Sequence, residues 1–441
     1  MKQLVVIFTL WLAWMPVGAQ KTLTLEECLK LGIENNLSLE GSRNEMRKAK
    51  HLLSENRAKL WPQISAVAGF NDNFNPPVSV TDGSAYGNLY NVTKTLQYNA
   101  SAGLQLQMPL YNQTVYTAVD IARTLNELNR RSYEKAREDL MMQICKMYYL
   151  GQNTMEQLTL IQENMVRLRE LRDITLAFFD NGMAMEVDVK RVNINLENQQ
   201  VQYDNAKSML VQQLNLLKYV MDYPADEEIT LTPVDTERIQ LASLTGLRGD
   251  LYELQLLQSQ EKLARQQKDL IRQGYLPSLT LTGSWMYSAY TDKARHWFHS
   301  GLSNHYPSTG LGITLRVPIF DGFDKRARIR KAQIDQENAK LNYENTLKNM
   351  QTQYLNATNE LMNNQRNFKK QKDNYLLAED VYQVTTDRYR EGIASMTEVL
   401  QDEMRMSEAQ NNYLSAHYNY QVANLALLKL TGQMDRLLQG N

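Results

Sequence analysis

Two acidic residues stand at matching places in the two halves of the sequence. Asp188 follows Gly182 by six residues, and Glu398 follows Gly392 by six residues. Glycine adopts positive φ without strain, so each glycine is suited to end one helix and turn the chain. An acid just after such a turn has two interpretations. Its charge attracts cations, or it stabilises the positive end of the next helix.

Histidines gather in one segment that is predicted to be a loop. His296, His299 and His305 lie there, with Asp292 nearby. Such a cluster can bind a metal ion, but a surface loop that is rich in histidine is the simpler interpretation, because a loop sequence does not define ligand geometry. The sequence therefore leads us to expect no metal site.

Other catalytic patterns are missing from the sequence. There is no glycine-rich phosphate loop, no pair of zinc-spaced cysteines and no convincing nucleophile with its base, so we expect neither an enzyme nor a cofactor. Cys28 and Cys145 lie in separate predicted helices, and both a disulfide and two buried free thiols remain open. The formal net charge of −1 gives no reason to expect a nucleic-acid partner.

The elements that position these residues are long. Residues 110–223 and 319–441 contain no proline, and each stretch follows an alternating segment that ends in Pro109 or Pro318. A helix runs far when proline is absent, because proline removes a backbone donor and clashes with the preceding turn. Each stretch is broken once, at Gly182 or Gly392. The chain therefore reads as strands, long helix, turn and long helix, written twice.

The pattern predicts four segments along the chain. A charged Lys2, an apolar run and a small-residue ending at Ala19 indicate a secretory signal peptide. The segment 75–97 is interpreted as a loop. The full division is 1–19, signal peptide; 20–222, first repeat, with strands 63–74 and 98–108 and a helical hairpin over 110–222; 223–244, linker; 245–441, second repeat, with strands 278–290 and 308–317 and a hairpin over 319–432.

The strands alternate between polar and apolar residues, which predicts one wet face and one apolar face. The polar positions are Gln105, Gln107, Thr280, Thr282, Thr314 and Arg316. The apolar face would meet lipid, and the aromatic residues that we expect with it at the membrane interfaces are Trp61, Tyr98, Trp285, Tyr287 and Tyr290. The last helix has a coiled-coil seam with a 4,3 spacing, formed by Ala409, Tyr413, Ala416, Tyr420, Ala423, Leu427 and Leu430.

Four strands in one chain cannot close a membrane barrel. An open edge leaves backbone groups unpaired in lipid at several kcal/mol each. A membrane interpretation therefore requires more than one copy of the chain. The alternative is a soluble sandwich that caps a helical bundle; the signal peptide and the polar strand face favour the membrane.

Three segments resemble one family. The opening Leu23-Thr24-Leu25-Glu26-Glu27-Cys28, the junction Pro318-Ile319-Phe320-Asp321-Gly322 and the turn Arg388-Tyr389-Arg390-Glu391-Gly392 are similar to those of TolC-type outer-membrane efflux proteins. The basic run 325–331 follows the second of these segments. The resemblance covers nearly the whole mature chain in the right order.

The resemblance implies a mostly α fold with a small β part. Internally duplicated, long coiled-coil helices would form a periplasmic α-barrel, and four strands per chain would contribute to a trimeric, twelve-stranded outer-membrane β-barrel. The protein would be a passive exit duct of a tripartite efflux or type I secretion system. Its implied partners are two further copies of itself, a periplasmic adaptor, an inner-membrane RND or ABC transporter and outer-membrane lipid.

The resemblance also implies a periplasmic gate at the helical turns. The residues assigned to it are Glu398, Asp188, Tyr389, Gly392, Gly182 and Asp402. In a trimer, one acid per chain becomes a ring of three, which would attract cations. The chain departs from the family's turn, because Ala394 replaces a basic residue and Gln401 replaces an acid.

Two other classes of protein remain as alternatives. A periplasmic coiled-coil adaptor or scaffold without a pore would also have long helical hairpins, but it would not repeat strand pairs around two arms. A secreted enzyme would need a site, and the sequence offers none.

Overall fold

The computed structural model describes residues 21–82, 87, 89–233, 242, 246–293 and 304–439. The predicted signal peptide and the histidines at 296 and 299 lie outside the described residues. Contacts divide the chain into two compact units, Met1–Glu45 with Arg130–Leu256 and Tyr343–Asn441, and Met46–Asn129 with Leu257–Asn342. Each unit combines segments of both sequence repeats.

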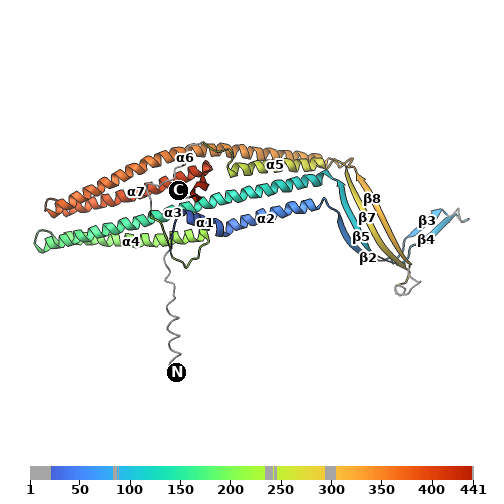
Figure 1. The fold of residues 1–441 in the computed structure, drawn as a ribbon, viewed down its shortest axis with the longest axis horizontal. Helices are drawn as coiled ribbons and strands as arrows, with labels where there is room; N and C mark the ends of the chain where they lie inside the picture. Colours follow the sequence, from blue (N-terminus) through green and yellow to red (C-terminus); the bar gives the residue numbers. More distant parts are fainter. Residues whose placement is uncertain are drawn as a thin grey trace, which may run out of the picture. The chain divides into compact units, whose positions relative to one another are not determined.

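Two very long helices carry the sequence repeat into the structure. Helix α3 spans Gln113–Asp180 with 68 residues, and α6 spans Asp324–Arg390 with 67 residues. Each is about 100 Å long at ~1.5 Å per residue. Helices α4 (Glu186–Met221) and α7 (Met396–Leu430) return beside them, so two helical hairpins result (Figure 1).

The remaining helices are shorter. They are α1 (Leu25–Asn35), α2 (Leu37–Ala58), α5 (Tyr252–Gln273) and the 3₁₀ helix η3 (Met434–Leu438). Helix α1 begins with a capping box, in which the Thr24 hydroxyl accepts from the backbone N–H of Glu27 and the Glu27 carboxylate accepts from that of Thr24. Among the described residues, no helix combines the length and apolar character that crossing a membrane requires.

Four strands form one antiparallel sheet in the second unit. They are β2 (Gln63–Asp72), β5 (Tyr98–Tyr111), β7 (Ser278–Thr291) and β8 (Asn304–Arg316), in the order β2-β5-β7-β8. The two strand pairs of the sequence repeats therefore meet in the middle of the sheet, where β5 pairs with β7. Strands β2 and β8 each have one edge that is unpaired within the described chain.

The register places the polar positions on one face. Gln107 lies opposite Thr282, and Thr280 lies opposite Thr314. Trp285 and Tyr287 lie on the other face, since side chains alternate along a strand. The expectation for Tyr290 was wrong: it is an even number of residues from Thr282, shares its polar face, and packs with its ring 6.2 Å from that of Tyr306.

A second, two-stranded sheet lies within the segment that was interpreted as a loop. Strands β3 (Val78–Asp82) and β4 (Tyr90–Lys94) pair with each other, and Val80 lies opposite Val92. The loop interpretation of 75–97 was therefore wrong. Each strand is only five residues long, and valine alternates with serine and threonine in β3 alone, so the surrounding glycine, proline and asparagine hid the pair.

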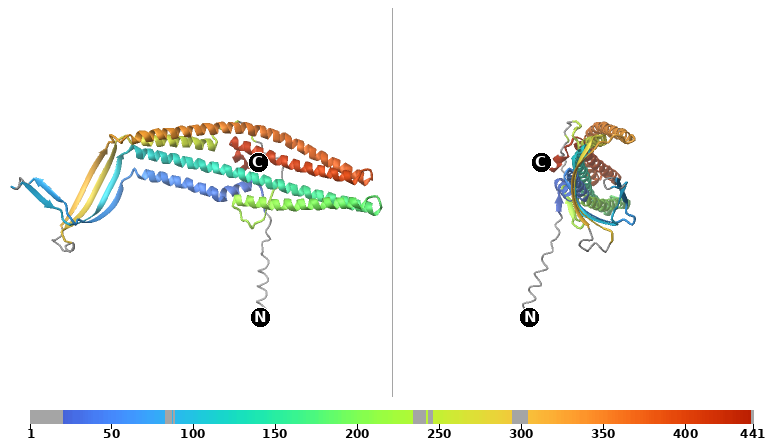
Figure 2. Two further views of the ribbon diagram at one scale, coloured as in Figure 1. Left: turned by 180° about the vertical axis from the view of Figure 1, so that it is seen from behind. Right: turned by 90° about the vertical axis from the view of Figure 1, so that its right-hand side faces the viewer.

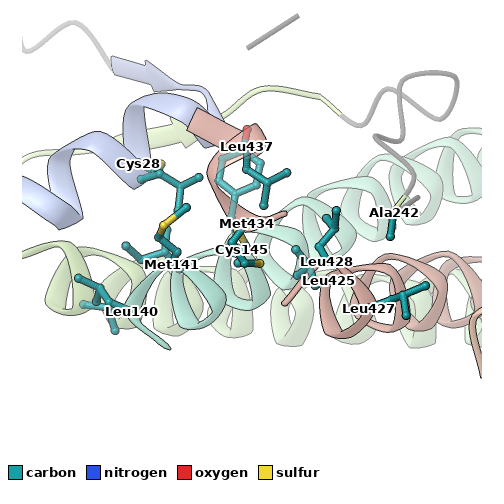
Figure 3. Packing of buried hydrophobic residues seen from close by; sticks show 14 of the residues in the cluster. Cys28, Leu140, Met141, Cys145, Ala242, Leu425, Leu427, Leu428, Met434 and Leu437 are labelled. Carbon is teal, nitrogen blue, oxygen red and sulfur yellow. The ribbon is translucent and has the colours of Figure 1, made fainter. Parts of the chain in front are cut away.

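The predicted linker contributes a strand to the first unit. Strand β6 (Ile229–Leu231) pairs in parallel with β1 (Lys21–Leu23). The main apolar core lies nearby, and Figure 3 shows its side chains. Cys28 and Cys145 are both buried in this core as free thiols. Burial raises the pKa of Cys28 to about 12 and also raises the pKa of Cys145, so both thiols are protonated at neutral pH.

The coiled-coil seam of the last helix is largely buried. Ala416, Tyr420, Ala423 and Leu427 face the core of the first unit. Phe368 of α6 stacks on Tyr420, with 5.8 Å between the ring centroids. The 4,3 spacing thus aligns one stripe of α7 with its neighbours, as the sequence predicted.

Candidate functional site at the helical turns

The two helical hairpins end in turns that have the same backbone structure. Gly182 and Gly392 have φ values of +73° and +76°. In the first turn, the N–H of Gly182 donates to Phe179 O at 2.9 Å, and that of Met183 to Phe178 O at 2.8 Å. This pair of bonds is a Schellman motif, which satisfies the last carbonyls of a helix and needs a left-handed residue.

The second turn repeats this pattern. The N–H of Gly392 donates to Tyr389 O at 2.9 Å, and that of Ile393 donates to Arg388 O at 2.8 Å. Both glycines are exposed, and a Cβ added at either would meet no atom within 4 Å. Glycine is therefore required at these positions by the positive φ angle. An added Cβ would meet no steric clash there.

Glu398 is held in a helix cap. Its carboxylate accepts from the backbone N–H of Ser395 at 2.8 Å and from the Ser395 hydroxyl at 3.1 Å. The same hydroxyl accepts from the backbone N–H of Glu398 at 3.3 Å. These hydrogen bonds lower the pKa of Glu398, with a smaller contribution from Arg388. The carboxylate is thus ionised and exposed at the turn.

Asp188 occupies the matching position with different partners. Its carboxylate accepts from the backbone N–H of Met185 at 3.4 Å and pairs with Arg191 at 3.1 Å. Arg191 also donates to the Thr397 hydroxyl at 3.4 Å. Because Thr397 belongs to α7, Asp188 orients an arginine that joins the two hairpins of one chain.

Tyr389 is buried between the hairpins, with 6% of its surface exposed. Its hydroxyl donates to the Thr175 hydroxyl on α3 at 3.4 Å, and its ring lies 5.6 Å from that of Phe178. Burial raises the pKa of Tyr389, so its hydroxyl remains protonated and can donate. Tyr389 thus links the end of α6 to the end of α3.

Asp402 lies one helical turn beyond Glu398 and is mostly buried. Its carboxylate accepts from the Thr385 hydroxyl at 2.8 Å and pairs with Arg405 at 3.2 Å. Both partners belong to the same hairpin. The six predicted residues therefore do not form one cluster: Gly182 and Asp188 build the first turn, while the others build and support the second.

An apolar cluster supports both turns. Its buried members include Leu171 of α3, Val192 of α4, Tyr382 of α6 and Val399 of α7. All four hairpin helices contribute, so the two turns rest on one core. Figure 2 shows the two hairpins ending in their turns at the same end of the helices. These residues lie within a few helical turns of each glycine, but no local pattern separates them from the other apolar residues of the same helices.

Polar bridges across the hairpins were also missed. Gln199 of α4 donates to Glu403 of α7 at 3.3 Å, and Asn164 of α3 donates to Gln410 of α7 at 2.7 Å. Glu403 is 3% exposed, and burial raises its pKa. No local pattern marks such pairs, because their members are more than 200 residues apart.

Metal binding has no support in the part of the chain that the structure describes, where no group of three or more potential ligands occurs. The hypothesis about His296, His299 and His305 is not tested, because the first two lie outside the described residues and the third has no described side chain.

The two helical halves match one family model. The model of the outer membrane efflux protein family matches residues 29–221 and 251–433, which together cover most of the chain. The chain belongs to the outer membrane efflux protein family. The members compared below are efflux channels of the outer membrane and not enzymes of a known class.

Two relatives have low sequence identity to this chain but align with it over most of its length. The outer membrane protein TolC of Vibrio cholerae is 24% identical over 324 residues, which cover 70% of this chain and 68% of that protein. The probable efflux pump outer membrane protein TtgC of Pseudomonas putida is 21% identical over 323 residues, which cover 71% of this chain and 63% of that protein.

Solved structures share the fold. CusC superposes with a TM-score of 0.76 at 16% identity, covering 92% of this chain and 91% of CusC. The open state of the MtrE outer membrane channel of Neisseria gonorrhoeae superposes with a TM-score of 0.75 at 19% identity, covering 94% of this chain and 91% of MtrE. The chain therefore has the fold of these channels.

Proposed function

We propose that three copies of this chain form an outer-membrane exit duct that conducts substrates passively. The duct would receive them from a periplasmic adaptor and an inner-membrane RND or ABC transporter. The observation that carries this proposal is the four-stranded sheet, which has one polar face, one apolar face and two edges that no strand of the described residues pairs with. A single copy of such a sheet cannot be stable in lipid.

Closure of the sheet sets the number of copies. Strand β8 of one copy would pair with β2 of the next, and three copies would give twelve strands, which lies within the range of outer-membrane barrels. The polar face would line water, and the apolar face would meet lipid. Trp285 and Tyr287 are exposed on that apolar face, as residues at a membrane interface are.

Helix α4 carries an exposed apolar stripe that supports the same assembly. Val187, Ile194 and Val201 follow one another at seven-residue intervals and are all exposed. The buried seam of α4 has the same interval, with Val192 and Gln199 as its first two members. A second heptad stripe on the opposite side has no partner within the described chain, and a second copy would cover it.

Helix α6 carries a similar stripe. Leu341, Leu355, Met362 and Leu376 are exposed and are separated by multiples of seven residues. One stripe on each hairpin is what a closed ring of helices needs, since every hairpin then has two neighbours. A periplasmic adaptor or scaffold without a pore remains the second candidate, but it does not account for the two-faced sheet.

The turns would form the gate of this duct. In a trimer, Glu398 and Asp188 each form a ring of three acids, and the exposed, ionised Glu398 would attract cations most strongly. Tyr389 and the cross-hairpin bonds would hold the two hairpins of one chain together in the closed state.

The test of the duct is direct. The full chain is purified from the membrane fraction in detergent, tested for a trimer that dissociates on heating, and recorded in planar bilayers. We expect single channels. A soluble, non-conducting monomer would contradict the proposal and favour the adaptor.

The gate assignment has its own variant. Glu398→Gln removes the charge and keeps a side chain that can complete the capping box. We expect lower cation selectivity and weaker block by multivalent cations. Glu360→Gln, an exposed acid in the middle of α6, is the matched control and should change neither. Unchanged selectivity and block in Glu398→Gln would refute the assignment.

A further inference from the structure

The turn between β8 and α6, residues 317–323, exposes large apolar side chains. Ile319 is 93% exposed, Phe320 is 75% exposed and Phe323 is 63% exposed. Three such residues within five positions form a contiguous apolar patch, which a soluble surface rarely presents without a partner. This β8–α6 turn lies wholly in the second unit.

The Asp321 side chain fixes the β8–α6 turn. The Asp321 carboxylate accepts from the N–H groups of Phe323 and Lys325, each at 3.2 Å, and pairs with the Lys325 ammonium at 3.2 Å. That ammonium also lies 5.0 Å from the ring centroid of Tyr275. The exposed side chains are therefore presented by a locked turn.

Phe323 adopts a strained conformation that keeps its ring outside. Its φ is +66°, directly after Gly322 at +65°. A phenylalanine rarely adopts this left-handed region, and such outliers persist where the surroundings impose them. The Phe323 ring meets that of Phe320 edge-on, with 5.5 Å between centroids. The strain thus builds a paired aromatic edge that faces solvent.

Unpaired cations follow immediately. Arg326, Arg330 and Lys331 are exposed and form no ion pair within the described chain. Arg326 and Arg330 are four residues apart, so they lie on one face of α6. The apolar turn and the cations therefore stand next to each other in the sequence and in the structure.

The β8–α6 turn also continues the apolar face of the sheet. Leu311, Ile313 and Leu315 alternate along β8 toward the turn and are all exposed. An apolar surface that leads into aromatic residues and then into cations matches the layers of a bilayer, in the order acyl chains, interface and anionic headgroups.

We propose that the β8–α6 turn inserts into the interfacial layer of a phospholipid leaflet, where Arg326, Arg330 and Lys331 bind anionic headgroups. This inference rests on the proposed membrane duct and adds the lipid class and the residues that select it. We choose lipid over a second copy of the chain because the order of apolar, aromatic and cationic residues along β8, the turn and α6 matches the order of the bilayer layers.

Tryptophan fluorescence in vesicles tests the insertion. Phe320→Trp is placed in a chain in which the other five tryptophans, Trp11, Trp14, Trp61, Trp285 and Trp297, are replaced by phenylalanine. The chain is reconstituted with phosphatidylglycerol or phosphatidylcholine brominated near the headgroup. We expect quenching by both lipids, and about twofold more by phosphatidylglycerol, because cations near the surface enrich anionic lipid.

Two controls keep the outcomes separate. A chain that retains only Trp285, on the apolar face of the sheet, reports whether the protein inserts at all. Met183→Trp, at an exposed position in the first helical turn, should not be quenched by lipid. Changing Arg326, Arg330 and Lys331 together to glutamine should abolish the preference for phosphatidylglycerol and leave the Trp285 signal unchanged.

The results then have distinct meanings. Quenching at Trp285 without quenching at Phe320→Trp would overturn this inference and leave the duct intact. Equal quenching by both lipids would overturn the headgroup selection. An unquenched Trp285 would instead count against the membrane duct. Crosslinking of position 320 to a second copy, without quenching, would assign the turn to the interface between copies.

Discussion

The turns of the two hairpins share a backbone and differ in their side chains. Both use a glycine near φ +75° and the same two Schellman hydrogen bonds. The N-cap residue of the next helix is Met185 in one turn and Ser395 in the other, and only Ser395 accepts a hydrogen bond through its side chain. The acid six residues after the glycine accepts from the backbone N–H of the cap residue in both turns, and in the first turn it also pairs with Arg191. The two turns thus have the same backbone geometry but different side-chain contacts.

The largest expected effect comes from the apolar core that supports both turns. Leu171→Ala should lower the free energy of unfolding by about 2–5 kcal/mol, because Leu171 is buried among side chains of both hairpins. Thermal unfolding in detergent, followed by circular dichroism, measures the loss. The exposed Leu176→Ala on the same helix is the control and should cost far less. Equal losses would show that the turns do not depend on this core.

The equivalence of the backbones predicts equal costs at the two glycines. Gly182→Ala and Gly392→Ala should each cost about 1–2 kcal/mol, since a residue with a Cβ is strained at positive φ. Gly41→Ala, within α2 and with no atom within 4 Å of its Cβ, should instead stabilise the chain by about 0.5–1 kcal/mol. Chemical denaturation measures the free energy of unfolding of the three variants. Markedly unequal losses at Gly182 and Gly392 would show that the two turns are not equivalent.

The unequal caps provide reciprocal variants. Ser395→Ala should cost about 1 kcal/mol, whereas Met185→Ser should gain a similar amount because it adds the missing hydroxyl. The melting temperature is the measurement. If Met185→Ser is neutral, the first turn differs from the second in more than its cap residue.

The pH dependence should have opposite signs at Glu398 and Glu403. The folded pKa of Glu398 is lowered, so its stabilising contribution is present above its unfolded pKa and is lost as the pH falls through the folded pKa. The folded pKa of Glu403 is raised, so folding favours its protonated form, and its contribution becomes less favourable as the pH rises through the unfolded pKa toward the folded one.

Melting temperatures measured across pH test these signs. Glu398→Gln should remove part of the loss of stability on acidification, and Glu403→Gln should remove part of the loss on raising the pH to neutral. Glu360→Gln is again the exposed control. Slopes that change in the same direction for both variants would contradict the assigned environments.

The smallest effect concerns the bond between the turns. Arg191→Gln should cost under about 1 kcal/mol, because Arg191 is about half exposed and surface ion pairs are weak. Adding Thr397→Val to Arg191→Gln should cost little more, since the two residues share one hydrogen bond. A double-mutant cycle measures the coupling, and strictly additive losses would show that Arg191 does not join the hairpins.

Sequence patterns predicted the positions of the two turns but not the contacts of the side chains around them. The two proline-free stretches, each with one glycine-centred break, located both turns, because helix length and helix ending depend on local chemistry. The spacing of Glu398 left open whether it acts as a cap or as a gate; the structure shows the cap, and the gate remains a proposal. The partners of Tyr389 and Asp402 were not predictable, because Thr175 lies 214 residues from Tyr389 and the choice of Thr385 depends on how α6 and α7 align.

The strands show the same limit. Alternation assigned faces correctly to Gln107 and Thr282, whereas Tyr290 was assigned to the wrong face because it was grouped by residue type and not by position. The hairpin β3–β4 escaped notice because each strand is too short to stand out from its surroundings.

The long helices, the two turns and the two-faced strands could be predicted from the sequence, because each follows from interactions within a few residues. Only the tertiary structure decided that β5 and β7 join the two repeats, that one apolar cluster supports both turns and that Phe323 is held outward beside Phe320. These features depend on which distant segments pack together. The free energy that favours this packing is spread over many contacts between residues far apart in the sequence, so no local pattern predicts it.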